Sequence, residues 1–276
     1  YHQNLDAYKA SKARLFEWET LSKSIINIDD DFGKTLATRI SHGVECITFG
    51  AGGEVSWSEL SYTPGRITGM WRTPWGKADL DLNLLGQFSV ANMAAALAFL
   101  CSEGESLSDV ASASTEVSGV PGRMEIFKSP SKPTVIVDYA HTPDALENAL
   151  ETARMQTDGR LVCLLGCGGD RDAKKRPIMG AIAERLADEI WFTTDNARSE
   201  DPYTIIDDMC SGLKDIENLN RCLDRQNAIE SAFQNMKEDD LLVVAGRGHE
   251  TTQEIGGKFV TLDDRELVSG LMGKER

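Results

Sequence analysis

Residues 134–165 read TVIVDYAHTPDALENALETARMQTDGRLVCLL, and this stretch decides the fold of the second half of the chain. It begins and ends with apolar runs, 134–137 and 161–165, which have the length of buried strands. Residues 143–156, between these runs, have the pattern of a helix. A strand, a helix and a second strand in this order predict two parallel strands joined by a crossover helix.

The same alternation of strand and helix continues to residue 245. Further apolar runs at 189–193, 219–223 and 241–245 alternate with helical stretches at 173–187, 203–213 and 225–237. This alternation predicts a doubly wound α/β fold, in which helices cover both faces of a parallel sheet. Such sheets bind ligands at the C-terminal ends of their strands.

The first half of the chain has a different pattern of predicted secondary structure. We expect helices at 4–17 and 32–40 around a strand at 24–28, strands and turns within 44–85, and helices at 88–103 and 107–117. The turn residues Gly119-Val120-Pro121-Gly122 then interrupt the pattern. We therefore expect two domains, 1–121 and 122–276.

Length, composition and charge are those of a globular protein of about two domains. Of the 276 residues, 41% are hydrophobic and 26% charged. Lys+Arg 29 against Asp+Glu 44 gives a net charge of −15 without a compensating basic stretch, which argues against a partner that is nucleic acid or an anionic membrane. The longest apolar stretch, 90–101, is too short for a membrane crossing of about 20 residues. Six cysteines without a C-x-x-C pair favour reduced thiols in the cytoplasm.

Polar clusters follow four of the five predicted strands, where each strand ends. They are Asp138–His141, Gly166–Arg171, Asp195–Arg198 and Gly246–Glu250. Because the carboxyl ends of parallel strands meet at one edge of a sheet, we expect these clusters to line one shared cleft.

Each cluster also has an interpretation without function. Asp138 and His141 would serve as caps of the next helix, and Arg198 would form an exposed ion pair of little energetic weight. The glycines at 166–169 would form only a tight turn, although their N–H groups also suit an anion. Glu250 follows His249 without the second histidine of an H-E-x-x-H helix, which disfavours a metal site there.

Gly33-Lys34-Thr35 resembles the end of a phosphate-binding loop, but the pattern is incomplete. The G-x-x-x-x-G-K-[ST] motif requires glycine at position 28, where the chain has isoleucine, and three aspartates at 29–31 would repel phosphate. No complete loop of this type occurs in the 276 residues.

Eight motifs, in this order, resemble those of the Mur ligase family. They are Y-x-x-S-K-x-R-L-F from Tyr8, I-I-N-I-D-D from Ile25, G-Q-F-S-V-A-N from Gly86, P-G-R-M-E from Pro121, V-D-Y-A-H-T-P-D-A-L from Val137, G-C-G-G-D-R-D-x-x-K-R-P-x-M-G from Gly166, D-N-A-R-S-E-D-P from Asp195 and G-R-G-H-E from Gly246. The resemblance covers essentially the whole chain. It implies part of the central ATPase domain of the family over 1–121, without the phosphate loop G-T-N-G-K-T, followed by the Rossmann-like C-terminal domain over 122–276.

The resemblance also implies an activity. It points to the branch that uses ATP and Mg²⁺ to add meso-2,6-diaminopimelate to UDP-N-acetylmuramoyl-L-alanyl-D-glutamate in peptidoglycan synthesis, and we expect a cytoplasmic monomer. Lys12 matches a carbamylated lysine that holds Mg²⁺. The positions that match ATP contacts are Asn92, Arg123, Asp138 and His141. The positions that match the diaminopimelate site are Arg171, Asn196, Arg198, Gly246 and Glu250. Independently of any family, a diacid with two ammonium groups needs guanidinium groups and carboxylates around it.

Two residues depart from the family pattern. Ser89 stands where the family usually has asparagine, and Ala197 replaces the proline of the usual D-N-P-R. Losing that proline raises the entropic cost of ordering the loop by about 0.5–1 kcal/mol. Arg198 is retained, and lysine-adding relatives lack it, so diaminopimelate is favoured.

Two other functions remain open from the sequence. One is a non-catalytic Mur-like binding or assembly module, and the other is a different amino-acid ligase of the same fold, such as a folylpolyglutamate synthetase. Because the chain begins with tyrosine and carries no phosphate loop, we also expect a fragment that is inactive alone.

Overall fold

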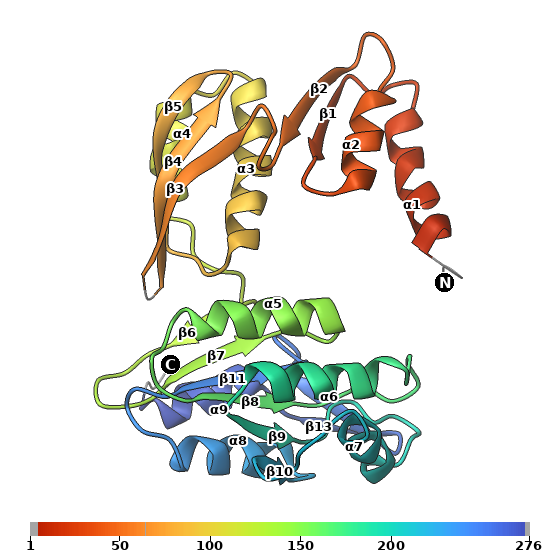
Figure 1. The fold of residues 1–276 in the computed structure, drawn as a ribbon, viewed down its shortest axis with the longest axis vertical. Helices are drawn as coiled ribbons and strands as arrows, with labels where there is room; N and C mark the ends of the chain where they lie inside the picture. Colours follow the sequence, from red (N-terminus) through yellow and green to blue (C-terminus); the bar gives the residue numbers. More distant parts are fainter. Residues whose placement is uncertain (1–4, 64, 274–276) are drawn as a thin grey trace. The chain divides into compact units, whose positions relative to one another are not determined.

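The computed structural model describes residues 5–63 and 65–273. It divides into two compact units, Tyr1–Ser118 and Gly119–Arg276 (Figure 1). No helix in the described part of the chain is long and apolar enough to cross a membrane. All six cysteines are free thiols.

The second unit is built on a six-stranded sheet of the predicted α/β type. Its strands are β6 (Glu125–Phe127), β7 (Thr134–Asp138), β8 (Leu161–Leu165), β9 (Glu189–Phe192), β10 (Leu219–Arg221) and β11 (Leu241–Ala245). The order across the sheet is β10-β9-β8-β11-β7-β6, and every neighbouring pair is parallel except β6 with β7. The predicted parallel sheet is therefore confirmed, and the late strand β11 lies between β7 and β8.

Helices cover both faces of this sheet because alternate side chains of its strands point in opposite directions. The helices are α5 (Pro143–Arg154), α6 (Lys175–Leu186), α7 (Pro202–Cys210), α8 (Arg225–Gln234) and α9 (Asp264–Leu271). Val135 and Val137 of β7 form one core with Ile229 of α8 and Val268 of α9. Ile136 is equally buried but points to the other face, where α5 packs against β8 and β11.

A small hairpin follows β11, formed by β12 (Thr252–Ile255) and β13 (Lys258–Thr261). The sequence did not predict it, nor did it predict the three-residue edge strand β6. Every residue of β13 is exposed, so the hairpin has no apolar alternation from which a strand could be recognised.

The first unit combines two small sheets. Strands β1 (Lys23–Asn27) and β2 (Glu45–Phe49) are parallel, and β3 (Ser56–Thr63), β4 (Arg66–Thr73) and β5 (Gly76–Leu82) form an antiparallel sheet. The helices are α1 (Leu5–Ala13), α2 (Asp31–Thr38), α3 (Gln87–Ser102) and α4 (Leu107–Ser114), with a 3₁₀ turn at Arg14–Glu17. Trp71 of β4 is fully buried against α3 side chains such as Val90 and Leu97.

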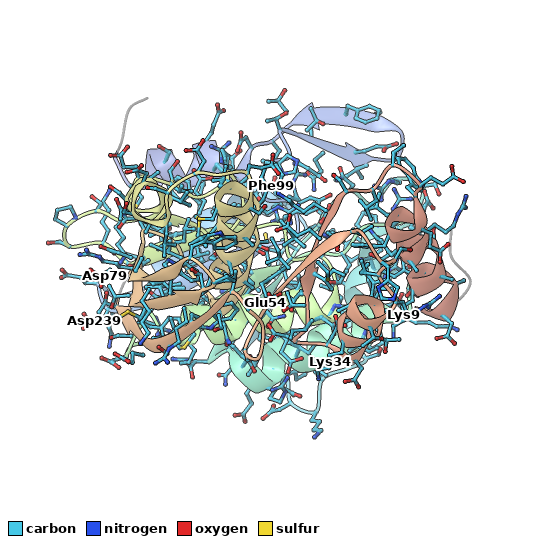
Figure 2. All side chains as sticks on the ribbon, turned by 90° about the horizontal axis from the view of Figure 1, so that it is seen from above. Lys9, Lys34, Glu54, Asp79, Phe99 and Asp239 are labelled. Atoms are coloured by element: carbon cyan, nitrogen blue, oxygen red, sulfur yellow. The ribbon has the colours of Figure 1, made fainter. Side chains whose placement is uncertain are left out.

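The incomplete phosphate-loop pattern lies at the start of α2 and is closed to phosphate. Asp30 caps this helix and accepts a hydrogen bond from the N–H of Gly33 at 2.6 Å. Lys34, labelled in Figure 2, pairs with Asp31 at 3.3 Å. Aspartate side chains thus take the place that an anion would need.

Candidate functional site

The four polar clusters lie in loops that follow β7, β8, β9 and β11, which are neighbours in the sheet. Gly246, in the loop after β11, lies close to all three of the other loops. Its φ of +111° favours glycine, and its N–H donates to the carbonyl of Asp138 at 3.1 Å. A Cβ atom there would lie 3.0 Å from Oδ2 of Asp195 and 3.3 Å from the carbonyl oxygen of Gly166. Gly246 therefore allows the loops to approach each other closely.

Asn196 links the loop after β9 to the segment after β11. Its Nδ2 donates to Oε2 of Glu250 at 2.7 Å, and its Oδ1 accepts from the N–H of Glu254 at 2.8 Å. Both side chains are only partly buried. The amide is therefore fixed in orientation. It holds one oxygen of the Glu250 carboxylate, and within residues 5–63 and 65–273 the other oxygen makes no hydrogen bond.

Arg198 sits in a strained and well-anchored position. Its φ of +52° lies in the left-handed region that side chains other than glycine seldom adopt. Its N–H donates to the carbonyl of Glu254 at 3.1 Å, and its own carbonyl accepts from Gly256 at 2.7 Å. The hairpin that contains β12 thus pairs with the backbone on both sides of the arginine.

The Arg198 guanidinium is bonded along one side only. Nη1 donates to the carbonyl of Gly169 at 2.7 Å and, more weakly, to that of Asn196 at 3.4 Å. Within the described residues, Nε and Nη2 make no hydrogen bond to protein. These two groups form the edge that can hold a carboxylate through two parallel hydrogen bonds.

Arg171 lies close to Arg198. A Cβ atom at Gly168 would be 3.1 Å from Nη1 of Arg198 and 3.8 Å from Cγ of Arg171, so the two arginines flank this glycine. Arg171 is exposed, and its Nη1 donates to the carbonyl of Asp170 at 3.3 Å. Two guanidinium groups and the Glu250 carboxylate on loops of adjacent strands can bind a ligand that carries both carboxylate and ammonium groups.

A second group of predicted residues surrounds Tyr139, just after β7. The Arg123 guanidinium carbon lies 4.4 Å from the centre of the Tyr139 ring. The rings of His141 and His249 lie 4.7 and 5.2 Å from it, respectively. Arg123 is exposed and makes no ion pair in the described part of the chain. This arrangement of rings and a free cation suits a ligand with an aromatic base and phosphates.

Asp138 has an internal role that the sequence did not reveal. Its carboxylate accepts hydrogen bonds from the N–H of Met124 at 2.7 Å and of Ala140 at 2.8 Å. Burial raises the pKa of Asp138 above its usual value, although these donors oppose the rise. Asp138 therefore fastens the P-G-R-M loop onto the end of β7 and so helps to fix Arg123.

Lys12 and Asn92 belong to the first unit, on α1 and α3, and both are exposed. The ammonium of Lys12 lies 5.5 Å from the centre of the Tyr8 ring. Ser89, which replaces the usual asparagine of the family, donates its hydroxyl to the carbonyl of Leu85 at 2.6 Å, in the first turn of α3.

The sequence interpretation overlooked buried arginines beside the site, among them Arg176 and Arg247. Arg176 of α6 is 1% exposed and pairs with Glu200 and Asp208. Arg247 is fully buried and donates to the carbonyls of Thr252 and Leu262. Both arginines lie inside motifs that were quoted for other residues, Arg176 in the motif from Gly166 and Arg247 in the motif from Gly246. Their position in these motifs was the signal that could have identified them.

Comparison with known proteins identifies relatives along the chain. The family described as "Mur ligase middle domain" matches residues 1–100, and "Mur ligase, glutamate ligase domain" matches residues 122–248. UDP-N-acetylmuramoyl-L-alanyl-D-glutamate–2,6-diaminopimelate ligase of Thermosynechococcus vestitus is 43% identical over all of this chain and 56% of its own length. The ligase of the same name from Chromobacterium violaceum is 44% identical over 93% of this chain and 53% of its own length.

Structural comparison also finds a ligase of this name. A solved structure of a ligase of that name is 33% identical, with a TM-score of 0.67, over 99% of this chain and 57% of the other. The chain thus spans about half the length of the relatives it matches.

Proposed function

The chain belongs to the Mur ligase family, and from this premise we propose that it serves ATP-dependent addition of meso-2,6-diaminopimelate to UDP-N-acetylmuramoyl-L-alanyl-D-glutamate. The observation that carries the proposal is the pair Arg198 and Glu250, on two loops that contact each other. The first offers an unbonded guanidinium edge and the second a carboxylate held by Asn196. Diaminopimelate has two carboxylates and two ammonium groups, which match these two charges.

In the proposed reaction the D-glutamyl carboxylate attacks the γ-phosphorus of ATP, which forms an acyl phosphate and releases ADP. The diaminopimelate amine then attacks the acyl carbon, and phosphate leaves as the amide forms. The residues of this chain would contribute by orienting the amine and neutralising charge rather than by forming a covalent bond.

We assign the two charged groups separate tasks in this binding. The free edge of Arg198 would grip the carboxylate at the far end of diaminopimelate, with Arg171 adding positive charge beside it. Glu250 would attract the neighbouring ammonium group, and the fixed Asn196 amide and the backbone at Gly246 would set its distance from the arginines. Lysine lacks the far carboxylate and would leave Arg198 unpaired.

We propose that the nucleotide contacts come from Asn92, Arg123, Asp138 and His141. The exposed Arg123 guanidinium fits a phosphate group, and its position over Tyr139 restricts its rotation. Asp138 would act mainly by holding the loop of Arg123, because both of its oxygens already accept backbone N–H groups.

The proposed Mg²⁺ site centres on Lys12 of the first unit. Among the described residues, no group of three or more His, Cys, Asp or Glu side chains is arranged to hold a metal ion. An unmodified lysine ammonium is not a metal ligand, whereas a carbamate is an anion whose oxygens would hold Mg²⁺. We propose that Lys12 becomes carbamylated, which would turn its cation into an anion.

The binding proposal is tested by titrating meso-diaminopimelate and L-lysine into the 276-residue chain in a calorimeter. We expect diaminopimelate to bind and lysine to bind much more weakly. Arg198→Ala should weaken diaminopimelate binding by about tenfold to a hundredfold, because charged hydrogen bonds of this type contribute about 1.5–3 kcal/mol. Arg185→Ala is the control, since Arg185 pairs with Glu147 on exposed helix surfaces. Equal binding of lysine, or no binding of diaminopimelate, would contradict the proposal.

Activity is tested after joining the chain to the N-terminal part of the Thermosynechococcus relative, where the family resemblance implies the phosphate loop that this chain lacks. ADP release should then require both the uridine nucleotide substrate and diaminopimelate. Carbamylation is tested separately by ¹³C NMR of the chain in ¹³C-bicarbonate. A carbamate signal should vanish in Lys12→Arg and persist in Lys9→Arg, because Lys9 lies on the same helix and also over an aromatic ring.

A further inference from the structure

The loop that orients Arg198 is held on both sides by one ion pair, between the buried Arg176 and the partly buried Glu200. Arg198 donates through Nη1 to the carbonyl of Gly169. The carbonyl of Gly168, one residue before, accepts from Nη2 of Arg176 at 3.2 Å. The N–H of Asp170, one residue after, donates to Oε1 of Glu200 at 2.5 Å. The direction of the Gly169 carbonyl is therefore set by Arg176 and Glu200.

Arg176 and Glu200 are bonded to each other, with the guanidinium buried and the carboxylate partly exposed. Nη2 of Arg176 lies 2.9 Å from Oε1 of Glu200, and Nη1 lies 2.9 Å from Oε2. Arg176 is 1% exposed, and Asp208 of α7 accepts from its Nη1 at 2.9 Å. A buried guanidinium with two carboxylate partners has little freedom to move.

The same network joins the two loops that carry left-handed residues. Asp170, with a φ of +53°, accepts hydrogen bonds from the hydroxyl and the N–H of Ser199, the residue after Arg198. Glu200 lies one residue further and donates its own N–H to the carbonyl of Ala197. Hydrogen bonds thus connect the two loops on both sides of Arg198. They restrict a backbone that, with alanine at 197, lacks the rigidity of proline.

We propose that Arg176 and Glu200 are positioning residues that fix the guanidinium of Arg198 and thereby set the preference for a diamino diacid over lysine. This inference rests on the proposed function of the Arg198 site. Neither residue touches the ligand. They orient the Gly169 carbonyl, which in turn orients the guanidinium of Arg198. They therefore affect only the binding of the carboxylate that diaminopimelate has and lysine lacks.

The test measures binding of meso-diaminopimelate and L-lysine to the 276-residue chain by calorimetry. Glu200→Gln keeps the shape of the side chain and removes its charge. We expect about tenfold weaker binding of diaminopimelate, as is usual when a residue supporting a ligand-binding group is lost, and little change for lysine. In an Arg198→Ala background, Glu200→Gln should have no further effect, because it acts through Arg198.

Glu189→Gln is the matched control. Glu189 is also a partly buried partner of an arginine, Arg160, at 3.0 Å, but it lies at the start of β9, at the opposite end of the strand from the site. It should leave the ratio of the two affinities unchanged. Arg176→Lys provides a second variant should Glu200→Gln unfold, because lysine cannot reach two carboxylates and a carbonyl together.

The outcomes separate the two proposals. Failure of the wild-type chain to prefer diaminopimelate would overturn the proposed function and this inference with it. A wild-type preference that Glu200→Gln and Arg176→Lys leave intact would overturn this inference alone. Equal weakening of both ligands, or additive effects with Arg198→Ala, would show that the network supports the fold in general and would also overturn it.

Discussion

The parallel strands of the six-stranded sheet begin at one side, the amino edge, and end at the other, the carboxyl edge. Each of these edges carries an arginine that pairs with two carboxylates, but the two networks hold different parts of the structure. At the amino edge, Arg160 pairs with Asp240 and Glu189 and donates to the carbonyl of Asn235. At the carboxyl edge, Arg176 pairs with Glu200 and Asp208 and donates to the carbonyl of Gly168. Arg160 is 41% exposed along its side chain, whereas Arg176 is 1% exposed.

The difference lies in what each network holds. Arg160 ties together the beginnings of strands that the sheet already fixes by its own hydrogen bonds. Arg176 holds a loop in which Asp170 and Arg198 adopt left-handed conformations. Those conformations cost free energy and persist only where surrounding contacts enforce them. Similar ion pairs therefore hold regular strands at one edge and a strained loop at the other.

The largest effect is expected from the buried pair Arg225 and Asp264, which also belongs to the carboxyl edge. Both side chains are fully buried, 2.8 Å apart, and Arg225 donates to the carbonyl of Ala245. Asp264→Asn would leave a buried guanidinium without a counter-charge and should lower the free energy of unfolding by about 3–5 kcal/mol. Urea unfolding measures this loss. At the amino edge, Glu189→Gln should cost no more than about 1 kcal/mol, and an equal loss there would erase the contrast between the edges.

A smaller effect is expected where two loops of the carboxyl edge touch. A Cβ atom at Gly169 would lie 2.0 Å from the carbonyl oxygen of Ala197. Gly169→Ala should therefore displace the backbone that orients Arg198, lower the free energy of unfolding by about 1–3 kcal/mol and weaken binding of diaminopimelate.

Gly270 of α9 is the control for this substitution, since nothing lies within 4 Å of its Cβ position. Gly270→Ala should stabilise the helix by about 0.5–1 kcal/mol and leave binding unchanged. Normal diaminopimelate binding by Gly169→Ala would mean that the loop contact does not set the geometry of the site.

The carboxyl-edge network should also respond to acid. The hydrogen bond from Arg176 lowers the pKa of Glu200 below its ordinary value of about 4.3. A carboxyl group whose pKa is lower in the folded state stabilises that state above its unfolded pKa, and this contribution disappears as the pH falls. We expect the difference in unfolding free energy between wild type and Glu200→Gln to be constant at neutral pH and to shrink below about pH 5. A difference that stays constant to pH 3 would show that the charge of Glu200 contributes nothing.

The smallest effect is expected at Ala197. In the described part of the chain its N–H donates no backbone hydrogen bond, so Ala197→Pro should remove none. Restricting the unfolded chain should stabilise the protein by about 0.5–1 kcal/mol, seen as a higher midpoint of thermal unfolding with unchanged ligand preference. A marked loss of stability would mean that the backbone at 197 differs from that of proline, and that the network alone fixes Arg198.

The sequence by itself determined the parallel sheet and the elements that form it. The apolar runs 161–165 and 241–245 coincide with β8 and β11, because a strand buried on both faces is apolar throughout. Helix α5 follows the predicted start, with Pro143 in its first turn and the Thr142 side chain as its cap. These signals are local, so a single sequence reveals them. The resemblance to the Mur ligases also came from the sequence, through motifs at the ends of these strands.

Only the tertiary structure decided how the residues of the site are held. Arg176 looked like an ordinary helical arginine, and the partners that bury it, Glu200 and Asp208, come from later parts of the chain. The left-handed turn at Arg198 depends on pairing with the hairpin that contains β12, more than fifty residues later. A sequence pattern records the preferences of neighbouring residues, whereas burial of an ion pair and enforcement of a strained turn arise from contacts between residues that folding brings together.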